Sequence, residues 1–326
     1  MPRRARPRRI VVVVFPGVQT LDAAGPAEVF AVAGRLTGRP LYEVVLASAD
    51  GGPVRTTAGF PVDTRPLRAL RPHRRDTVLV AGGEDAAVRQ AARDRRLLGF
   101  LTRAARVAQR FGSVCSGTFV LAAAGLLDGR RVATHWAGCD LLAHAYPRVH
   151  VDRDAIFVTD GRLWTSAGVT TGIDMALAML EADHGRRIVD QVAAHLVLYV
   201  RRPGFQSQWS AALVAQQDGS APLAPVIAWA RRHLAEPLGV ERLARQAGMS
   251  PRTFHRRCLE TLEVTPAQLV ARLRVERART LLATSRLGGK EIAAQCGLRD
   301  GAQLARLCRR RLGLSPREYR ALFAEG

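Results

Sequence analysis

The segment Leu243-Ala-Arg-Gln-Ala-Gly248-Met249 occurs a second time as Ile292-Ala-Ala-Gln-Cys-Gly297-Leu298, 49 residues further along the chain. Beyond the glycine the match continues at an offset of 50, with Phe254-x-Arg256-x-Cys258 against Leu304-x-Arg306-x-Cys308. A helix, a turn containing glycine and a second helix are therefore written twice. This repeat predicts two helix-turn-helix units in an all-α C-terminal domain.

The second helix of each unit has an apolar inner face and a basic outer face. Phe254 and Cys258 lie one turn apart and are expected to face inward, like Leu304 and Cys308. Ser250 is expected to cap the first of these helices. Our candidate DNA contacts are this cap residue and the outward side chains: Ser250, Arg252, Thr253, Arg256, Arg257, Arg306, Arg309 and Arg310. A small helical bundle with solvated arginines is the alternative, and the repetition in register disfavours it.

The charge of the chain points to an acidic polymer as partner. The 326 residues include 49 basic and 28 acidic ones, and the formal net charge is +21. Residues 223–326 alone hold 20 basic and 9 acidic residues, which makes this part the denser cation. RNA is a weaker alternative because only 6% of the residues are aromatic and we find no stacking ladder. We therefore expect double-stranded DNA as the partner.

Length and composition favour a two-domain cytoplasmic protein. The chain is long enough for about two domains, and 48% of its residues are hydrophobic. No apolar run approaches the roughly 20 residues that a membrane span needs, so no membrane is expected as a partner. The basic N-terminus is followed by no signal-peptide cleavage site. The five cysteines form no CxxC pair, which disfavours both a disulfide framework and a zinc ribbon.

Residues 10–200 alternate between strand and helix patterns and predict a flavodoxin-like α/β domain with a layered parallel sheet. The expected strands are 10–15, 42–48, 77–81, the end of 107–114, 155–159 and 163–165, and the expected helices include 85–106, 117–124 and 172–183. Periodicity is lost after residue 200. We expect a basic tail at 1–9, a linker at 201–222 and the double helix-turn-helix domain at 223–326.

A cysteine in the α/β domain is the sharpest chemical candidate. In Arg110-Phe-Gly-Ser-Val-Cys115-Ser-Gly-Thr-Phe119 a strand ends at Cys115 and a helix follows. A thiol at a helix N-terminus is expected to have a lowered pKa and to favour thiolate. A buried structural cysteine is the alternative, and the local sequence does not decide between the two. The small-residue loop 165–172, which includes Thr170, either allows tight packing or offers amides to a ligand.

Metal and cofactor signals are weak. His135 and Cys139 have i, i+4 spacing, but no third ligand is evident. Neither a G-x-G-x-x-G sequence nor a P-loop is present. We therefore expect no metal and no cofactor.

Residues 223–326 resemble the DNA-binding domain of AraC/XylS-type transcription regulators. The resemblance is carried by Leu243-Ala244, by Gly248-Met-Ser-Pro-Arg-Thr-Phe254-x-Arg256, by Ile292-Ala293-x-x-Cys296-Gly297 and by Leu312-Gly-Leu-Ser-Pro316-x-x-Tyr319-Arg320. It implies that Arg252 and Arg256 read bases from the first unit and Arg306 from the second. Gly301 and Ala302 stand where relatives often place polar base-reading side chains. The second unit is therefore expected to anchor the DNA backbone more than it reads sequence.

Residues 10–200 resemble the ThiJ/PfpI glutamine-amidotransferase-like superfamily, especially isonitrile hydratases and the ligand domain of GlxA-type AraC regulators. The fragments that carry the resemblance are Phe15-Pro-Gly-Val-Gln-Thr-Leu-Asp22-x-x-Gly25-Pro26, Ala81-Gly82-Gly83, Cys115-Ser116-Gly117, Ala123-Ala-Gly-Leu-Leu127 and Ala133-Thr-His-Trp136. It implies that Asp22 lies beside the Cys115 sulfur, with the Gly83 amide near an oxyanion site and His135 at the rim. Gly83, Ser116 and Thr170 are the candidate ligand-binding residues.

One departure from the family pattern matters for function. PfpI-type peptidases have a histidine directly after the cysteine, whereas this chain has Ser116, so proteolysis is not expected. The leading hypothesis is a transcription regulator that binds promoter DNA as a homodimer. Its N-terminal domain is expected either to sense an unknown small molecule or to mediate dimerisation, and RNA polymerase is a further candidate partner. The rival hypothesis is a hydratase or hydrolase that depends on Cys115 and Asp22, with His135 as a third candidate, attached to a DNA-binding module.

Overall fold

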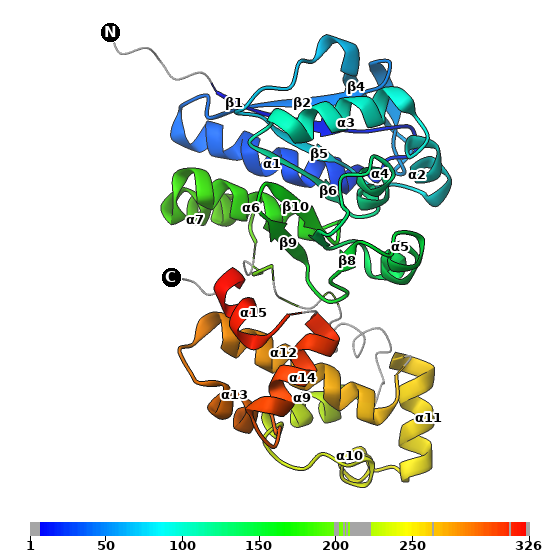
Figure 1. The fold of residues 1–326 in the computed structure, drawn as a ribbon, viewed down its shortest axis with the longest axis vertical. Helices are drawn as coiled ribbons and strands as arrows, with labels where there is room; N and C mark the ends of the chain where they lie inside the picture. Colours follow the sequence, from blue (N-terminus) through cyan, green and yellow to red (C-terminus); the bar gives the residue numbers. More distant parts are fainter. Residues whose placement is uncertain are drawn as a thin grey trace. The chain divides into compact units, whose positions relative to one another are not determined.

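The computed structural model describes residues 7–198, 202–204, 206, 208, 223–262, 264–312 and 314–323. The chain divides into two compact units, Met1–Gly204 and Phe205–Gly326 (Figure 1). We expected the first domain to end at residue 200, but residues 202–204 belong to the first unit. Most of the expected linker, residues 209–222, lies outside the described residues. The basic tail was expected to reach residue 9, whereas the first strand already begins at Arg8.

The first unit is built on an eight-stranded, mostly parallel sheet with the strand order β3-β4-β2-β1-β5-β6-β10-β9. Its strands are β1 (Arg8–Val13), β2 (Tyr42–Ser48), β3 (Gly52–Arg55), β4 (Pro61–Pro66), β5 (Thr77–Val80), β6 (Arg110–Val114), β9 (Phe157–Asp160) and β10 (Leu163–Ser166). β3 and β9 run antiparallel to their neighbours, and the other neighbouring pairs are parallel. The short strands β7 (Arg131–Val132) and β8 (His150–Val151) form a separate pair.

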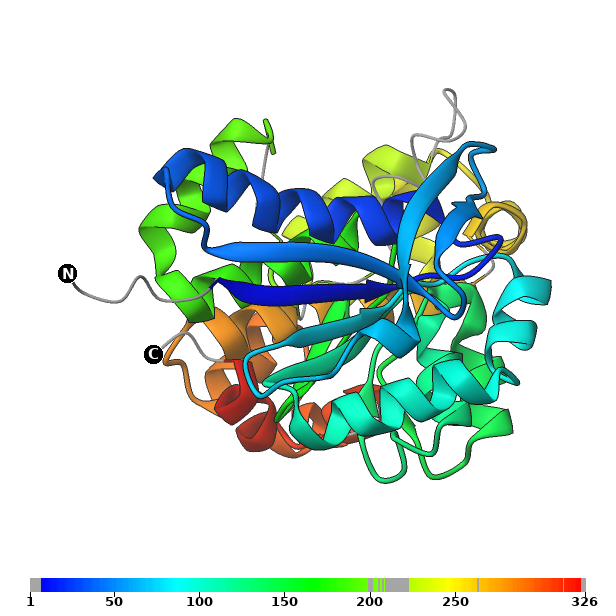
Figure 2. The same ribbon diagram turned by 90° about the horizontal axis from the view of Figure 1, so that it is seen from above.

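Helices cover both faces of this sheet (Figure 2). One face packs against α1 (Thr20–Thr37), α6 (Thr171–His184) and α7 (Arg186–His195), and the other against α2 (Asp85–Ala91), α3 (Arg95–Val107) and α4 (Gly117–Ala123). Neighbouring residues of β1 point to opposite faces of the sheet. Ile10 and Val12 pack on the face covered by α1, α6 and α7, and Val11 and Val13 pack on the face covered by α2, α3 and α4. α5 (Cys139–Ala145) follows a 3₁₀ turn at Trp136–Gly138, and another 3₁₀ turn lies at Leu67–Ala69. The layered α/β fold predicted from sequence is confirmed.

Several details of this unit differ from the expectation. The single helix expected at 85–106 is two helices, because the Asp94 side chain accepts hydrogen bonds from the backbone amides of Arg96 and Leu97 and starts α3 anew. The β3-β4 hairpin was missed, since most of its side chains are exposed and give no buried apolar run. Across the part of the chain that the structure describes, no helix is both long and apolar enough to span a membrane.

The second unit consists of helices arranged as two helix-turn-helix units. The helices are α9 (Leu223–Arg232), α10 (Val240–Gln246), α11 (Pro251–Leu262), α12 (Pro266–Thr284), α13 (Gly289–Gln295), α14 (Gly301–Leu312) and α15 (Pro316–Phe323). Each helix-turn-helix unit has a hydrophobic core of its own. The helix α12 contributes Leu269 and Leu273 to the core of the first and Leu281 and Leu282 to the core of the second. Gly248 and Gly297 make the two turns with φ of 63° and 64°, which favours glycine.

Candidate DNA-binding surface and cysteine site

α11 presents the outward face that the sequence predicts. Phe254 and Cys258 are fully buried, whereas Arg252, Arg256 and Arg257 are exposed. The Ser250 hydroxyl caps the helix by accepting a 3.2 Å hydrogen bond from the amide of Thr253. The two hydroxyls of Ser250 and Thr253 also lie 2.9 Å apart, so both side chains are engaged at the helix start.

Arg256 and Arg257 of α11 are held only loosely. Glu260 Oε1 lies 3.7 Å from Arg256 Nε, and Glu260 Oε2 lies 3.9 Å from Arg257 Nη1. Exposed ion pairs of this kind contribute at most about 1 kcal/mol. These side chains can therefore exchange the carboxylate for a phosphate or a guanine edge at little cost.

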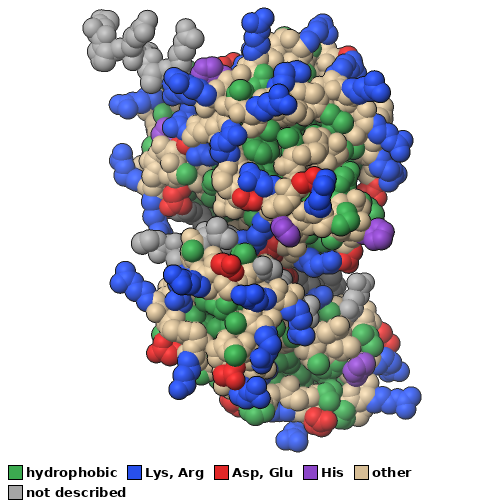
Figure 3. All heavy atoms as spheres, viewed as in Figure 1, with side chains coloured by type: hydrophobic (Ala, Val, Ile, Leu, Met, Phe, Trp, Pro, Cys, Tyr) green, Lys and Arg blue, Asp and Glu red, His purple; other side chains and the backbone are tan. Residues whose placement is uncertain are grey.

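α14 is more uniformly basic than α11. Arg306, Arg309 and Arg310 are exposed, and its sequence contains no acidic residue. Asp300 caps the helix, because its Oδ1 accepts a 2.7 Å hydrogen bond from the amide of Gln303. Gln303 Oε1 in turn accepts from the amide of Arg299 at 2.7 Å, so this side chain is engaged in capping. Lys and Arg side chains are spread over the visible surface of the second unit of the chain (Figure 3).

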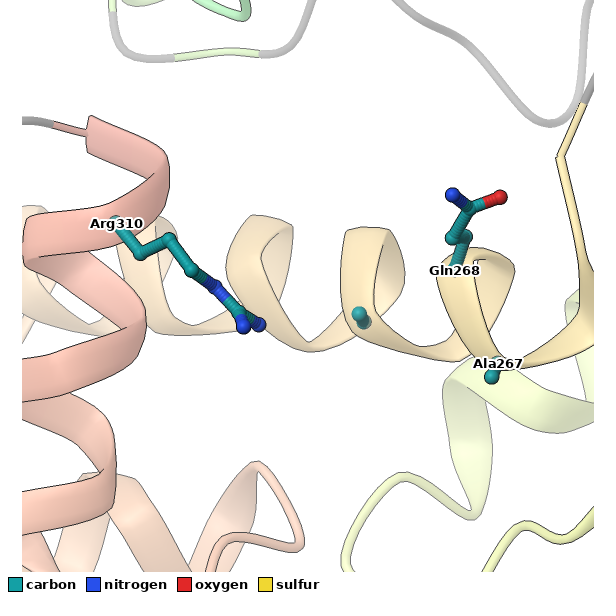
Figure 4. A pocket seen from close by; sticks show the side chains of 4 residues that line it. Ala267, Gln268 and Arg310 are labelled. Carbon is teal, nitrogen blue, oxygen red and sulfur yellow. The ribbon is translucent and has the colours of Figure 1, made fainter.

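Arg310 also borders an open groove beside α12. The groove is lined by Ala267, Gln268, Ala271 and Arg310 (Figure 4). The Arg310 side chain extends from α14 toward α12, the helix that carries Ala267 and Gln268 (Figure 4). Arg310 therefore borders this groove as well as standing on the exposed face of α14.

Cys115 lies at a strained elbow between β6 and α4. Its φ of 57° is in the left-handed region, which is uncommon for a residue other than glycine. Its amide donates to the Ser166 carbonyl at 2.9 Å, which ties the elbow to the end of β10. The Thr134 hydroxyl donates to the Cys115 carbonyl at 3.1 Å. The elbow therefore holds the half-buried thiol in a defined position.

Asp22, Cys115 and Ser116 converge around Gly82. A Cβ on Gly82 would lie 2.8 Å from Asp22 Oδ2, 2.8 Å from Cys115 Cβ and 2.7 Å from Ser116 Oγ. Asp22 is fully buried on α1, and its Oδ1 accepts a 2.6 Å hydrogen bond from the amide of Val169. The structure thus brings together Asp22 and Cys115, which are far apart in sequence.

The loop before α6 closes over the thiol. A Cβ on Gly168 would lie only 2.7 Å from Cys115 Sγ, so a glycine is required there. Val169 has a φ of 51°, which is unusual for a β-branched residue. The sequence placed Gly82 in the Ala81-Gly82-Gly83 fragment and Gly168 and Val169 in the small-residue run 165–172, but it assigned none of the three a role at the thiol.

Burial keeps the Cys115 thiol protonated. Burial is the main cause, and the charge of Asp22 adds to it, so that the pKa of Cys115 rises to about 12. Burial likewise raises the pKa of Asp22 to about 6, although the hydrogen bond from Val169 lowers it. The expectation of a lowered thiol pKa is therefore wrong, because desolvation outweighs the effect of the short helix that follows.

The remaining candidate residues are occupied by local contacts. The Gly83 amide donates to Ser116 Oγ at 3.1 Å, and Ser116 Oγ lies 3.2 Å from the Gly83 carbonyl. The Thr170 hydroxyl accepts from Arg202 Nη2 at 2.8 Å. Ser116 therefore takes the amide that we expected to serve an oxyanion.

None of the contacts described above for Cys115 involves His135. Its Nδ1 accepts a 3.4 Å hydrogen bond from the Ala137 amide, and burial lowers the pKa of its imidazole. The Cys139 thiol lies 3.5 Å from the His135 carbonyl, so it is directed to the backbone. These contacts tie both side chains to the backbone around the start of α5.

The two units define a class of protein: a regulator in which a DJ-1/PfpI-type α/β domain precedes a double helix-turn-helix domain. Residues 8–182 match the DJ-1/PfpI family, and residues 243–322 match a helix-turn-helix domain. The chain is 31% identical over 317 residues to the HTH-type transcriptional regulator GlxA of Rhizobium meliloti, covering 96% of this chain and 95% of that protein. The chain belongs to the DJ-1/PfpI family and, within it, to the HTH-type transcription regulators.

Part of the chain is similar to further proteins. It is 36% identical over 199 residues to an isonitrile hydratase of Pseudomonas putida, covering 61% of this chain and 82% of the hydratase. A ThiJ/PfpI family protein from Pseudomonas syringae superposes with a TM-score of 0.55 at 23% identity, covering 76% of this chain and 93% of that chain. The resemblances seen in the sequence are thereby confirmed at the level of family and fold.

Proposed function

We propose that this transcription regulator binds promoter DNA through α11 and α14 and senses a small molecule at the Cys115–Asp22 site. The observation that carries the DNA-binding part is that two helix-turn-helix units each expose several arginines and bury the apolar side of the same helix. In such units the second helix enters the major groove. Arg252, Arg256 and Arg306 are the proposed base readers, and Arg309 and Arg310 the proposed phosphate contacts.

Selection from a random pool of duplexes with the full-length protein tests this proposal. We expect a defined sequence motif, protected over two major-groove segments about one helical turn apart. The logarithm of the binding constant should fall linearly with the logarithm of the salt concentration, with a slope of about −0.9 for each phosphate contacted. Recovery of no motif, together with salt-independent binding, would contradict the proposal.

The sensing part rests on the buried pair of Asp22 and Cys115. A carboxyl group and a protonated thiol lie side by side beneath the 168–169 loop. Such a pair can receive a small polar ligand through hydrogen bonds once the loop opens. We further propose that the regulator works in the cytoplasm as a homodimer and that RNA polymerase is a partner at the promoter. Sedimentation of the protein with and without DNA tests the dimer.

A cysteine-dependent hydratase is the second candidate function. It is favoured by the strained elbow at Cys115 next to Asp22 and by the likeness to an isonitrile hydratase. Hydration adds one water to an isonitrile and yields the N-substituted formamide. Formation of that product by the protein, and its loss in Cys115→Ser, would support this function. The raised thiol pKa weighs against it, because the thiolate is the nucleophile.

A further inference from the structure

We propose that Arg202 couples the Cys115–Asp22 site to the chain segment that leads into the DNA-binding unit. This proposal rests on the proposed function and adds the route by which the site regulates DNA binding. It assigns a positioning role to Arg202, which contacts neither Cys115 nor Asp22 directly.

The first step of the route joins the site to the 168–170 loop. The Val169 amide donates to Asp22 Oδ1 at 2.6 Å, and Gly168 packs directly on the Cys115 side chain. A ligand or modification at the thiol therefore has to displace this backbone. Because Val169 has a φ of 51°, the loop depends on these contacts to keep its conformation.

The second step joins the loop to Arg202. Thr170, the residue after Val169, accepts a 2.8 Å hydrogen bond from Arg202 Nη2. The same guanidinium donates to Asp174 Oδ2 from Nε at 3.0 Å and from Nη2 at 2.6 Å. Asp174 lies in the first turn of α6 and is 7% exposed. This two-pronged, charge-assisted contact fixes the orientation of the guanidinium.

The third step joins Arg202 to the chain that leaves the first unit. The Arg202 amide donates to Asp174 Oδ1 at 3.0 Å, so backbone and side chain are held by one carboxylate. Two residues later, the Gly204 carbonyl accepts from the Phe157 amide at 3.4 Å. A Cβ on Gly204 would lie 2.7 Å from the Phe157 ring, so the chain is closely packed here. The first unit ends at this point.

Three consecutive residues of one loop thus contact the thiol, its carboxyl partner and the exit of the chain. Loss of the Val169–Asp22 bond relaxes the loop, which moves Thr170 and weakens the hold on Arg202. The Arg202 contacts in turn favour the closed loop. Such coupling between two sites is reciprocal in free energy.

A double-mutant cycle tests the coupling with the full-length protein and the duplex that it selects from a random pool. Asp22→Ala removes the acceptor for the Val169 amide, and Arg202→Ala removes the contact to Thr170. We expect Asp22→Ala to change the Kd for the duplex by about fivefold or more in the parent chain. In the Arg202→Ala chain the same substitution should have almost no effect.

Arg9→Ala provides the matched control. Arg9 Nη2 lies 2.6 Å from Asp76 Oδ2, and Asp76 is buried. Arg9→Ala therefore also deprives a buried carboxylate of its arginine partner. Arg9 lies in β1 and has no described bond to the 168–170 loop. The effect of Asp22→Ala should persist in the Arg9→Ala chain. Equal effects of Asp22→Ala in the parent and Arg202→Ala chains, or none in the parent, would overturn the coupling.

Two further measurements keep the test decisive. If Arg202→Ala does not fold, Thr170→Val removes the link to the loop while it leaves the Arg202–Asp174 ion pair, and it should uncouple in the same way. If no duplex is selected, the proposed function fails, but hydrogen exchange still tests the link. Arg202→Ala should then speed exchange in peptides covering 168–175, and Arg9→Ala should not. Unchanged exchange in those peptides would overturn the inference.

Discussion

Gly297 lies so close to Leu234 that a Cβ on the glycine would be 2.0 Å from the Leu234 carbonyl oxygen. Gly248 makes the equivalent turn of the first helix-turn-helix unit with nearly the same φ. A Cβ on Gly248 would meet nothing within 4 Å. The two turns therefore share a backbone conformation and differ in what packs against it.

This difference predicts unequal costs for the same substitution. Gly248→Ala should lower the free energy of unfolding of its unit by about 1–2 kcal/mol, because alanine is strained in the left-handed region. Gly297→Ala should cost about 1–3 kcal/mol more, because the backbone near Leu234 must also move. Pulse hydrogen exchange in increasing urea, read on peptides from α10 and α13, measures both. Equal losses would show that the Leu234 contact yields easily.

Features set by neighbouring residues could be predicted from the sequence. The repeat located both turn glycines, and helical spacing placed Phe254 and Cys308 inside and Arg256 outside. The runs of buried residues located the main strands of the sheet. These features follow from backbone conformation and side-chain periodicity, which are local properties.

Features set by distant residues could not be predicted in this way. The family resemblance implied that Asp22 lies near Cys115, but nothing indicated that the Val169 amide binds the carboxyl. The thiol pKa was predicted in the wrong direction because burial by the 168–169 loop is a tertiary effect. Arg202 was assigned to a linker, although a carboxylate 28 positions earlier holds it.

Base reading and backbone anchoring by the arginines should separate experimentally. Arg256→Ala should cost about 1–3 kcal/mol of binding free energy on the selected duplex and much less on random DNA, because a bidentate contact needs a guanine. Arg309→Ala should weaken both duplexes more evenly and reduce the salt dependence by about one phosphate contact. Fluorescence anisotropy at several salt concentrations measures these effects. Equal losses for Arg256→Ala on both duplexes would make it a phosphate contact.

The Cys115 thiol should react slowly near neutral pH. With a pKa of about 12, only about one thiol in 10⁵ is ionised at pH 7. The rate of alkylation by iodoacetamide should rise about tenfold for each pH unit below that pKa. Asp22→Asn should speed the reaction, because it removes a negative charge that raises the thiol pKa. Mass spectrometry of the Cys115 peptide measures the rate.

The buried cysteines of the second unit serve as internal references for this reaction. Cys258, Cys296 and Cys308 are at most 1% exposed, whereas Cys115 is half-buried. They should react later than Cys115, since they become accessible only when their unit opens. A fast, pH-independent reaction of Cys115 would mean that its thiolate is stabilised after all.

Asp22 should make the first unit less stable as the pH rises. Its pKa is raised from 3.8 to about 6, chiefly by burial, so the folded state prefers the protonated carboxyl. The resulting stabilisation is complete below the unfolded pKa and is lost as the pH rises through about 6. Asp22→Asn keeps an oxygen for the Val169 amide and cannot ionise. The free energy of unfolding of Asp22→Asn relative to the parent should therefore increase by up to about 3 kcal/mol as the pH rises from about 4 to about 7.5.

Asp183 offers a control with the opposite sign. Burial raises its pKa, but hydrogen bonds from Arg110 and Tyr42 outweigh that effect and leave the pKa below its usual value. Its carboxylate therefore stabilises the fold above the unfolded pKa, and this contribution is lost as the pH falls through the folded pKa. Asp183→Asn should lose stability relative to the parent at about pH 7.5 more than at about pH 4. Urea unfolding at both pH values measures the stability of the two variants relative to the parent. If this relative stability changed in the same direction with pH for both variants, the raised pKa assigned to Asp22 would be refuted.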